Sequence, residues 1–214
     1  MSRAIRKATE ADSPFIAWVE LAAARSHLTR GFFDVSLATP EGQTLGIIEK
    51  ICVSEVISFS HWSGFLVAEV DGTPAAGLSG YDPAERGTET FITAVQDGLA
   101  RSGWADPEIE QAFERLMPFT TCSMETPPDC WVVEWVATRA EFRGRGLVHS
   151  LLEEILEEGR RRGFGQAQIS LLLENHAAQR AYESAGFKVE EEKRHPLFEE
   201  TFGSPGMLRM LRPL

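Results

Sequence analysis

The sequence predicts a single α/β domain in which short strands and amphipathic helices alternate along all 214 residues. Two observations carry this prediction. Residues 65–81 hold a strong β-hairpin signal, and residues 131–173 read as a strand, a glycine-rich turn, a helix and a second strand. The alternation is too tight for two independent domains. With 43% hydrophobic and 25% charged residues, the chain has the composition of a globular protein with a core of its own.

The N-terminal quarter predicts one strand followed by two helices. Residues 4–8 form the expected strand, and Thr9 followed three positions later by Asp12 is a helix start signal. The first helix carries an apolar stripe of Phe15, Ile16, Val19 and Ala23. The second follows Pro40, with Leu45, Ile48 and Cys52 at three- and four-residue steps, and ends near Ser54. We expect irregular chain between the two helices.

The middle of the chain predicts a hairpin and then two helices. Asp71-Gly72 separates the apolar runs 65–70 and 75–81, which favours two antiparallel strands joined by a tight turn. Residues 82–129 then hold two helical patterns where a compact sheet would need only a turn. The first pattern consists of Phe91, Ile92, Val95 and Leu99. The second has Asp106 as N-cap and Pro107 at the first helical position, followed by Ile109, Ala112, Phe113 and Leu116.

The C-terminal third is the most regular part of the sequence. Residues 131–137 read as a largely buried strand, and the turn Arg143-Gly144-Arg145-Gly146 leads into a helix over residues 147–162. Apolar pairs at four-residue steps give this helix one buried face, and Gly163 ends it. A strand at 166–173, a helix from Asn175 through Tyr182, and strands at 187–193 and 206–211 complete the expected order.

Composition narrows the class of function. The formal net charge of −11 argues against nucleic acid as a partner, because binding to phosphates needs clustered Lys and Arg. No apolar stretch long enough for a signal peptide or a membrane span begins at the N-terminus, so we expect a cytoplasmic protein without a membrane partner. Cys52, Cys122 and Cys130 lack disulfide or zinc spacing, and the histidines show no metal spacing. We therefore expect no metal site and three buried thiols.

The turn before residue 147 is a candidate phosphate site. The first turn of a helix exposes unpaired N–H groups and a partial positive charge, and glycines let a pyrophosphate approach that backbone. Arg143 and Arg145 add full charges. Taken alone, the turn is better explained as a tight turn that requires glycine, because it lacks the Lys-Ser/Thr of a nucleotide P-loop and the third glycine of a dinucleotide fingerprint.

A second motif downstream decides between these interpretations. Asn175-His176-Ala177-Ala178-Gln179-Arg180-Ala181-Tyr182, continuing to Gly186-Phe187, resembles the Asn-x-x-Ala-x-x-x-Tyr-x-x-x-Gly-Phe run of the GNAT family of N-acetyltransferases. Arg143-Gly144-Arg145-Gly146 is similar to that family's pyrophosphate loop, Arg/Gln-x-x-Gly-x-Gly/Ala. Residues 5–12 are also similar to the family's first strand and helix start. The likeness spans the chain except residues 82–129.

The resemblance implies a fold and a cosubstrate. The fold is a mixed, mostly antiparallel sheet flanked by helices, splayed open between its two central parallel strands, with residues 82–129 as a helical insertion between strands 3 and 4. Residues 131–193 would be the acetyl-CoA-binding core. The implied cofactor contacts come from Val136, Ala137, Thr138, Arg143, Gly144, Arg145, Gly146, Leu147, Val148, Asn175, Ala178 and Tyr182. One departure is Val148, where the family has Gly or Ala, and its β-branched side chain could crowd the pyrophosphate.

Two residues are candidates for the chemistry of acetyl transfer, which needs a base for the amine and a proton for the departing thiolate. Tyr182 matches the family position that donates to the leaving sulfur. With phenol near pKa ~10 and thiol near ~8.5, that transfer is uphill by roughly 2 kcal/mol. Glu134 lies in an otherwise apolar strand, two residues before Val136, and a carboxylate there is costly unless it faces a cleft or has a partner. A structural ion pair explains Glu134 equally well.

The sequence does not identify the acceptor of the acetyl group. We expect the helices of residues 82–129 to cover the acceptor site, which favours the primary amine of a small molecule. The alternatives are a protein N-terminus or lysine as acceptor, and a non-catalytic CoA-binding regulator. A second use of the insertion would be a homodimer contact through the apolar face of Ile109, Phe113 and Leu116.

Overall fold

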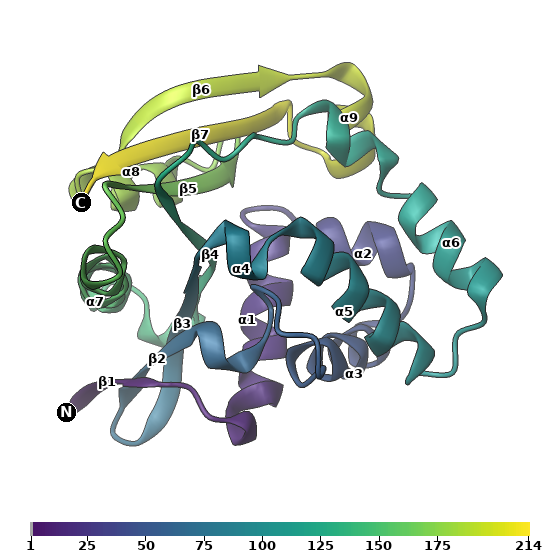
Figure 1. The fold of residues 1–214 in the computed structure, drawn as a ribbon, viewed down its shortest axis with the longest axis horizontal. Coiled ribbons are helices and arrows are strands. Elements are labelled where there is room, and N and C mark those ends of the chain that lie inside the picture. Colours follow the sequence, from purple (N-terminus) through teal and green to yellow (C-terminus); the bar gives the residue numbers. More distant parts are fainter. Residues whose placement is uncertain (1) are drawn as a thin grey trace.

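The computed structural model describes residues 2–214, and at its centre lies one seven-stranded sheet (Figure 1). The strands are β1 (Arg3–Lys7), β2 (Phe65–Val70), β3 (Thr73–Tyr81), β4 (Cys130–Thr138), β5 (Gln166–Leu172), β6 (Lys188–Arg194) and β7 (Gly206–Pro213). Their order in the sheet is β1-β2-β3-β4-β5-β7-β6. Within this sheet β4 and β5 are parallel and the other neighbours are antiparallel. The prediction of a mixed, mostly antiparallel sheet is confirmed.

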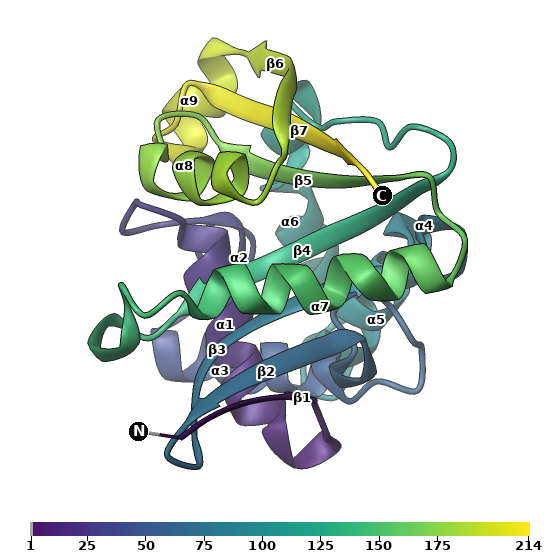
Figure 2. The same ribbon diagram turned by 90° about the vertical axis from the view of Figure 1, so that its left-hand side faces the viewer.

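Helices cover both faces of the sheet (Figure 2). One face carries α7 (Leu147–Arg161) and α8 (His176–Ser184), whose apolar side chains share a core with β2, β3, β4 and β5. The other face carries α1 (Ser13–Arg25), α2 (Phe32–Leu37), α3 (Glu41–Cys52), α5 (Thr88–Ala100) and α6 (Asp106–Glu114). Two short helices, α4 (Pro83–Arg86) and α9 (Pro196–Phe202), and the 3-10 turns η1 (Glu10–Asp12), η2 (Trp62–Gly64), η3 (Met117–Thr121) and η4 (Ala140–Phe142) complete the structure.

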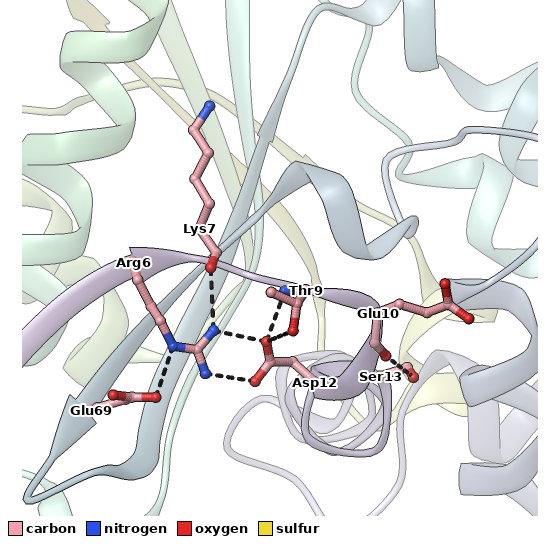
Figure 3. Close-up of polar contacts among 7 residues, drawn as sticks. All are labelled: Arg6, Lys7, Thr9, Glu10, Asp12, Ser13 and Glu69. Carbon is pink, nitrogen blue, oxygen red and sulfur yellow. Dashed lines mark hydrogen bonds and ion pairs between the residues drawn. The ribbon is translucent and has the colours of Figure 1, made fainter.

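The helix start signal near the N-terminus is confirmed in the detail of its hydrogen bonds (Figure 3). The Asp12 carboxylate accepts from the backbone N–H of Thr9 at 2.8 Å and from its hydroxyl at 2.9 Å. Both terminal nitrogens of Arg6 in β1 donate to the Asp12 carboxylate, and its Nε donates to Glu69 of β2 at 2.8 Å. The Arg6 guanidinium holds the pKa of Asp12 at about 2. This network joins β1, β2 and the start of α1.

Most predicted elements lie where the sequence pattern places them. The hairpin turn is at Asp71 and Gly72, with φ of 51° and 77°, as a two-residue turn with two positive φ values requires. The expected helix after Pro40 is α3, and the expected long helix is α7, which buries Leu151, Leu152 and Ile155. The three cysteines, Cys52, Cys122 and Cys130, are buried free thiols.

Two short helices were not predicted, and the first of them corrects the expectation of irregular chain between the first two helices. Residues 32–37 form α2, because Asp34 accepts from the N–H of Gly31 at 2.9 Å and Arg25 holds that carboxylate at 2.7 Å. Residues 196–202 form α9, which no pattern in the sequence predicted. Pro196 occupies its first position and His195 Nδ1 accepts from the N–H of Leu197 at 3.2 Å. Both helices depend on tertiary contacts, since isolated helices of this length are unstable in water.

The segment from residue 82 to residue 129 is helical, as predicted, but its details differ. It contains α4 and η3 in addition to the two expected helices. The N-cap of α6 is Ala105 rather than Asp106, because Glu108 reaches back to the N–H of Ala105 at 2.8 Å. Ile92 is exposed rather than part of the buried face.

The proposed dimer face on α6 is partly occupied within the chain. Ile109 and Phe113 pack into the core cluster of α1, α3 and α5, and Leu116 packs beside Phe198 and Phe202 of α9. Phe113 and Leu116 remain half-buried, and a homodimer contact through these three side chains stays a prediction. Within residues 2–214, no helix is both long and apolar enough to cross a bilayer.

Candidate active site

The two central strands separate halfway along their length. Pairing between β4 and β5 runs from Cys130 and Gln166 to Val133 and Ile169, yet β4 continues to Thr138 and β5 to Leu172. Beyond Val133 every residue of β4 is half-buried, whereas the first four residues, up to and including Val133, are buried. The expectation of a largely buried strand thus holds for only its first half. Figure 2 shows the strands diverging toward the N-terminal end of α7 and toward α8.

The glycine-rich turn lies at this open end. Gly144 and Gly146 have φ of 71° and 73°, the left-handed region in which glycine carries no penalty. Gly146 is the N-cap of α7, and no side chain caps that terminus. The backbone N–H groups of the first helical turn are therefore left for solvent or for an anion.

The two arginines of the turn hold the loop to its surroundings. Arg143 is exposed and its Nε contacts the carbonyl oxygen of Thr138 at 3.4 Å. Arg145 donates to the carbonyl of Glu141 at 3.2 Å and lies over the Phe142 ring. Leu147 is buried, and Val148 packs against the core beneath α7. The Val148 side chain is thus engaged with the core, which argues against the expected crowding of the turn.

The second motif forms the corner between β5 and α8. Asn175 is the N-cap of α8, and its Oδ1 accepts from the N–H of Ala178 at 3.1 Å. Its Nδ2 donates to Ser26 Oγ at 2.7 Å, which joins this corner to the end of α1. Tyr182 follows on the buried side of α8, with its ring edge-on to Phe187. Burial, together with the nearby Glu134 carboxylate, raises the pKa of Tyr182.

Glu134 stands where β4 leaves β5. It pairs with Ser79 of β3, and the next residue, Trp135, has a φ of 54° and forms a bulge in the strand. The Glu134 carboxylate is near Glu20, Tyr81 and Tyr182. Burial raises its pKa to about 7, although the N–H of Trp135 hydrogen-bonds to the carboxylate and opposes the change. No salt-bridge partner lies within reach among residues 2–214, so the alternative of a structural ion pair is not supported.

Four side-chain polar atoms on β4 and β5 are buried without a hydrogen-bond partner in the described part of the chain. Trp131 Nε1 and Gln168 Oε1 lie where the strands pair, and Thr138 Oγ1 and Ser170 Oγ lie beyond the last pair. Buried hydroxyls are normally paired, by protein, water or a ligand. Both hydroxyls are placed where the two strands no longer pair. An amide-bearing ligand between the strands would supply the missing partners.

Aromatic side chains surround Trp135 on the face of α1 and α5. The members of this aromatic cluster are Phe32, Phe33, Phe59, Tyr81, Phe91, Phe119 and Trp135. Phe59 stacks on Phe91 at 4.4 Å and on Tyr81 at 5.0 Å. Phe91 and Phe119 belong to the inserted segment, which therefore lies against the strand that carries Glu134.

Sequence reasoning missed several residues of this site. Trp135, Tyr81 and Ser60 carry no local pattern, since a bulge and a ring cluster are set by contacts distant in sequence. Glu20 did carry a signal. It lies four residues after Ile16 on the apolar stripe of the first helix, and a carboxylate there is as unusual as Glu134 in its strand.

Comparisons with known proteins agree with this geometry. The model of the acetyltransferase (GNAT) family matches residues 41–187. Among solved structures, the crystal structure of an acetyltransferase has a TM-score of 0.71 and 22% identity, and the match covers 98% of each chain. An N-acetyltransferase from Staphylococcus aureus Mu50 has a TM-score of 0.70 and 21% identity, covering 99% of this chain and 100% of that one.

A third similar structure contains a ligand. It comes from Salmonella typhimurium with its cofactor acetyl-CoA, and has a TM-score of 0.53 and 17% identity, covering 100% of this chain and 95% of that one. A search of curated proteins gives no match. At these identities the structural likenesses establish the fold.

Proposed function

The chain belongs to the acetyltransferase (GNAT) family and is an N-acetyltransferase that uses acetyl-CoA; we propose that its acceptor is the primary amine of a small molecule, which attacks the thioester directly in a ternary complex. The observation that carries the proposal is Glu134, a carboxylate with a pKa of about 7 at the point where β4 and β5 separate. In this proposal the whole chain acts as one domain, with residues 131–193 as the cofactor-binding core.

The diverging strands fit the pantetheine arm of acetyl-CoA. In the proposal its amides bond to the backbone of Val136, Ala137 and Thr138, and the unpaired Oγ atoms of Thr138 and Ser170 support this placement. Asn175 and Ala178 form the corner beside the arm, which Ser26 holds in place. These residues bind the cosubstrate by matching its donors and acceptors, and no metal is required.

The glycine-rich turn fits the pyrophosphate. The proposed contacts are the backbone of residues 143–148, with the charges of Arg143 and Arg145 close by. The uncapped N-terminus of α7 supports this role, because unpaired N–H groups at a helix N-terminus bind anions. Leu147 and Val148 contribute their backbone and bury their side chains in the core.

Glu134 is the proposed general base. With a pKa of about 7, it is about half ionised in neutral solution, and its ionised form is basic enough to accept the proton that the attacking amine loses. The amine attacks in its neutral form: its nitrogen bonds to the acetyl carbon, the carbon–sulfur bond breaks, and the electron pair stays on sulfur. Glu134 holds the proton that the amine loses, either directly or through a water molecule.

Tyr182 is the proposed proton donor to the thiolate. Burial raises the pKa of Tyr182, which widens the gap of roughly 2 kcal/mol expected from unperturbed phenol and thiol. The same burial disfavours a thiolate at the end of the pantetheine arm and raises the thiol pKa as well. The transfer therefore depends on the difference between the pKa of Tyr182 and the pKa of the thiol, which lie in the same apolar environment.

A small-molecule acceptor is supported by what covers the site. Phe59 and Tyr81, together with Phe91 of the inserted helix α5, lie on the same side of β4 as Trp135. A protein acceptor would need an open groove here. A helical segment packed against the site favours a compact amine with an apolar body over a protein acceptor.

A panel of amines tests this proposal. Small primary amines, peptides with free N-termini and lysine peptides are each mixed with acetyl-CoA, and release of free thiol is followed. We expect turnover with small amines that carry an apolar or aromatic group. Turnover with peptides alone would instead establish the protein-acceptor alternative, and CoA binding without turnover would establish the regulator.

A substitution in the turn tests the pyrophosphate site. Gly146→Asp places a carboxylate at the N-cap of α7, where it would bind the same N–H groups and repel the pyrophosphate. We expect the Kd for CoA, measured by calorimetry, to rise about tenfold or more. Gly103→Asp is the matched control, because Gly103 has a similar φ of 85° and open space around it. Equal CoA affinities for the two variants would contradict the proposed contact.

A further inference from the structure

A buried carboxyl group lies behind the proposed base. Glu20 of α1 is 0% exposed and is packed among the apolar side chains of α1, α3 and α5. Its Oε1 accepts from Cys52 Sγ at 3.5 Å, and its Oε2 accepts from Ser60 Oγ at 3.0 Å. Burial raises the pKa of Glu20 well above its usual value, which favours the neutral acid. A neutral Glu20 avoids a second negative charge beside Glu134.

Ser60 connects this carboxyl to β4. The indole Nε1 of Trp135 donates to Ser60 Oγ at 3.2 Å, so Ser60 bridges Glu20 and Trp135. Ser60 is itself completely buried. Its hydroxyl can accept from the indole and donate to the carboxyl at the same time, so both its donor and its acceptor function are satisfied without water.

Trp135 has a backbone conformation that must be stabilised by surrounding contacts. Its φ of 54° lies in the left-handed region, which is unfavourable for a bulky side chain and persists only where surrounding contacts enforce it. The contacts that the structure provides include the bond to Ser60, stacking on Phe33 at 5.6 Å, and ring contacts with Phe59 and Phe91. The bulge in turn sets the direction of Glu134, whose carboxylate accepts from the Trp135 N–H.

We infer that Glu20 and Ser60 are positioning residues: through the indole of Trp135 they hold the bulge of β4 that points Glu134 into the opening between β4 and β5. The inference rests on the proposed role of Glu134 in acetyl transfer. It adds residues from α1 and from the loop before β2 to a site whose other parts come from β4, α7 and α8.

The electrostatic surroundings of Glu134 make the inference measurable. The ionisable groups near its carboxylate are Glu20 from α1, Tyr81 from β3 and Tyr182 from α8. The Trp135 N–H lowers the pKa of Glu134, whereas burial raises it. If the bulge relaxes and this hydrogen bond is lost, the pKa of Glu134 should move above about 7.

Two small substitutions test the connection. Ser60→Ala removes the bridge, and Trp135→Phe removes the indole N–H while keeping an aromatic ring against Phe33. In each variant the pKa of Glu134 is followed by NMR of labelled glutamate carboxyl carbons, with Glu134→Gln used to assign the signal. We expect an upward shift in both variants, and kcat lower by on the order of tenfold with KM for acetyl-CoA unchanged. The double variant should resemble the single variants, because each single variant already removes the hydrogen bond between Trp135 and Ser60.

A conservative variant separates positioning from plain stability. Glu20→Gln keeps a neutral side chain with an oxygen that accepts from Ser60, so we expect it to retain the wild-type pKa of Glu134 and the wild-type kcat. Lower Tm values in Ser60→Ala and Trp135→Phe, with the pKa of Glu134 and kcat unchanged, would overturn the inference. Full activity of Glu134→Gln would instead overturn the role of the base, and the NMR readout would still decide whether Ser60 positions Glu134.

Discussion

Replacing Glu134 by Gln is expected to slow acetyl transfer by about a hundredfold or more, because the amine then lacks a base of suitable pKa. In the wild-type protein, kcat/KM should fall as the pH drops below about 7, where Glu134 becomes protonated. The residual activity of Glu134→Gln should lack this dependence. The measurement is thiol release from acetyl-CoA over a range from roughly pH 5 to pH 9 with one accepted amine.

The same substitution should stabilise the protein. Burial raises the pKa of Glu134 from 4.5 to about 7, so the folded state binds this proton more tightly than the unfolded state. That stabilisation is complete below the unfolded pKa and is lost as the pH rises through the folded pKa. At pH 8 the ionised group therefore lowers the free energy of unfolding by up to roughly 3 kcal/mol.

Gln carries no charge, so we expect Glu134→Gln to be more stable than the wild type at pH 8 but not at pH 4. Denaturant unfolding at both pH values measures the difference. Glu110→Gln is the matched control, since Glu110 is exposed on α6 and should change neither rate nor stability. A Glu134→Gln protein with the wild-type rate would exclude Glu134 as the base.

Replacing Tyr182 by Phe is expected to lower kcat by about a hundredfold, because the departing thiolate loses its proton donor. The KM for acetyl-CoA should change little, since the ring that packs against Phe187 remains. Steady-state rates of thiol release at saturating amine give both quantities. Calorimetry with CoA confirms that the cosubstrate still binds.

Tyr81, the other of the two tyrosines in the sequence, provides the control for this experiment. Tyr81 is also buried, also near Glu134, and stacks on Phe59. We expect Tyr81→Phe to keep most of the activity. If Tyr81→Phe lost activity and Tyr182→Phe did not, the proton donor would be Tyr81, and the motif-based assignment would be wrong.

Local sequence was sufficient for the parts of this protein that depend on neighbours along the chain. The hairpin at Asp71-Gly72, the start signal of Thr9 and Asp12, and the amphipathic face of α7 rest on backbone conformation and on helical or strand periodicity. The glycine-rich turn and the N-cap Asn175 belong to the same class. Each is a short stretch whose residue types specify one local structure, and each lies where the pattern predicts.

Contacts distant in sequence decided the rest. The short helices α2 and α9 form because Phe33, Phe198 and Phe202 are buried against other elements, and a local pattern of six or seven residues is too weak to predict them. The packing of the inserted segment against β4 likewise depends on contacts distant in sequence, which bring α5 and η3 to this face of the sheet.

The chemistry of the site was the least predictable property. The sequence by itself placed Tyr182 at a motif position and Glu134 in an otherwise apolar strand, and it predicted a helix N-terminus after the glycines. Only the tertiary structure decided the pKa of Glu134, the bulge at Trp135, and the link through Ser60 to Glu20. The physical reason is that desolvation and charge proximity depend on which surfaces the fold brings together, and these surfaces come from segments distant in sequence.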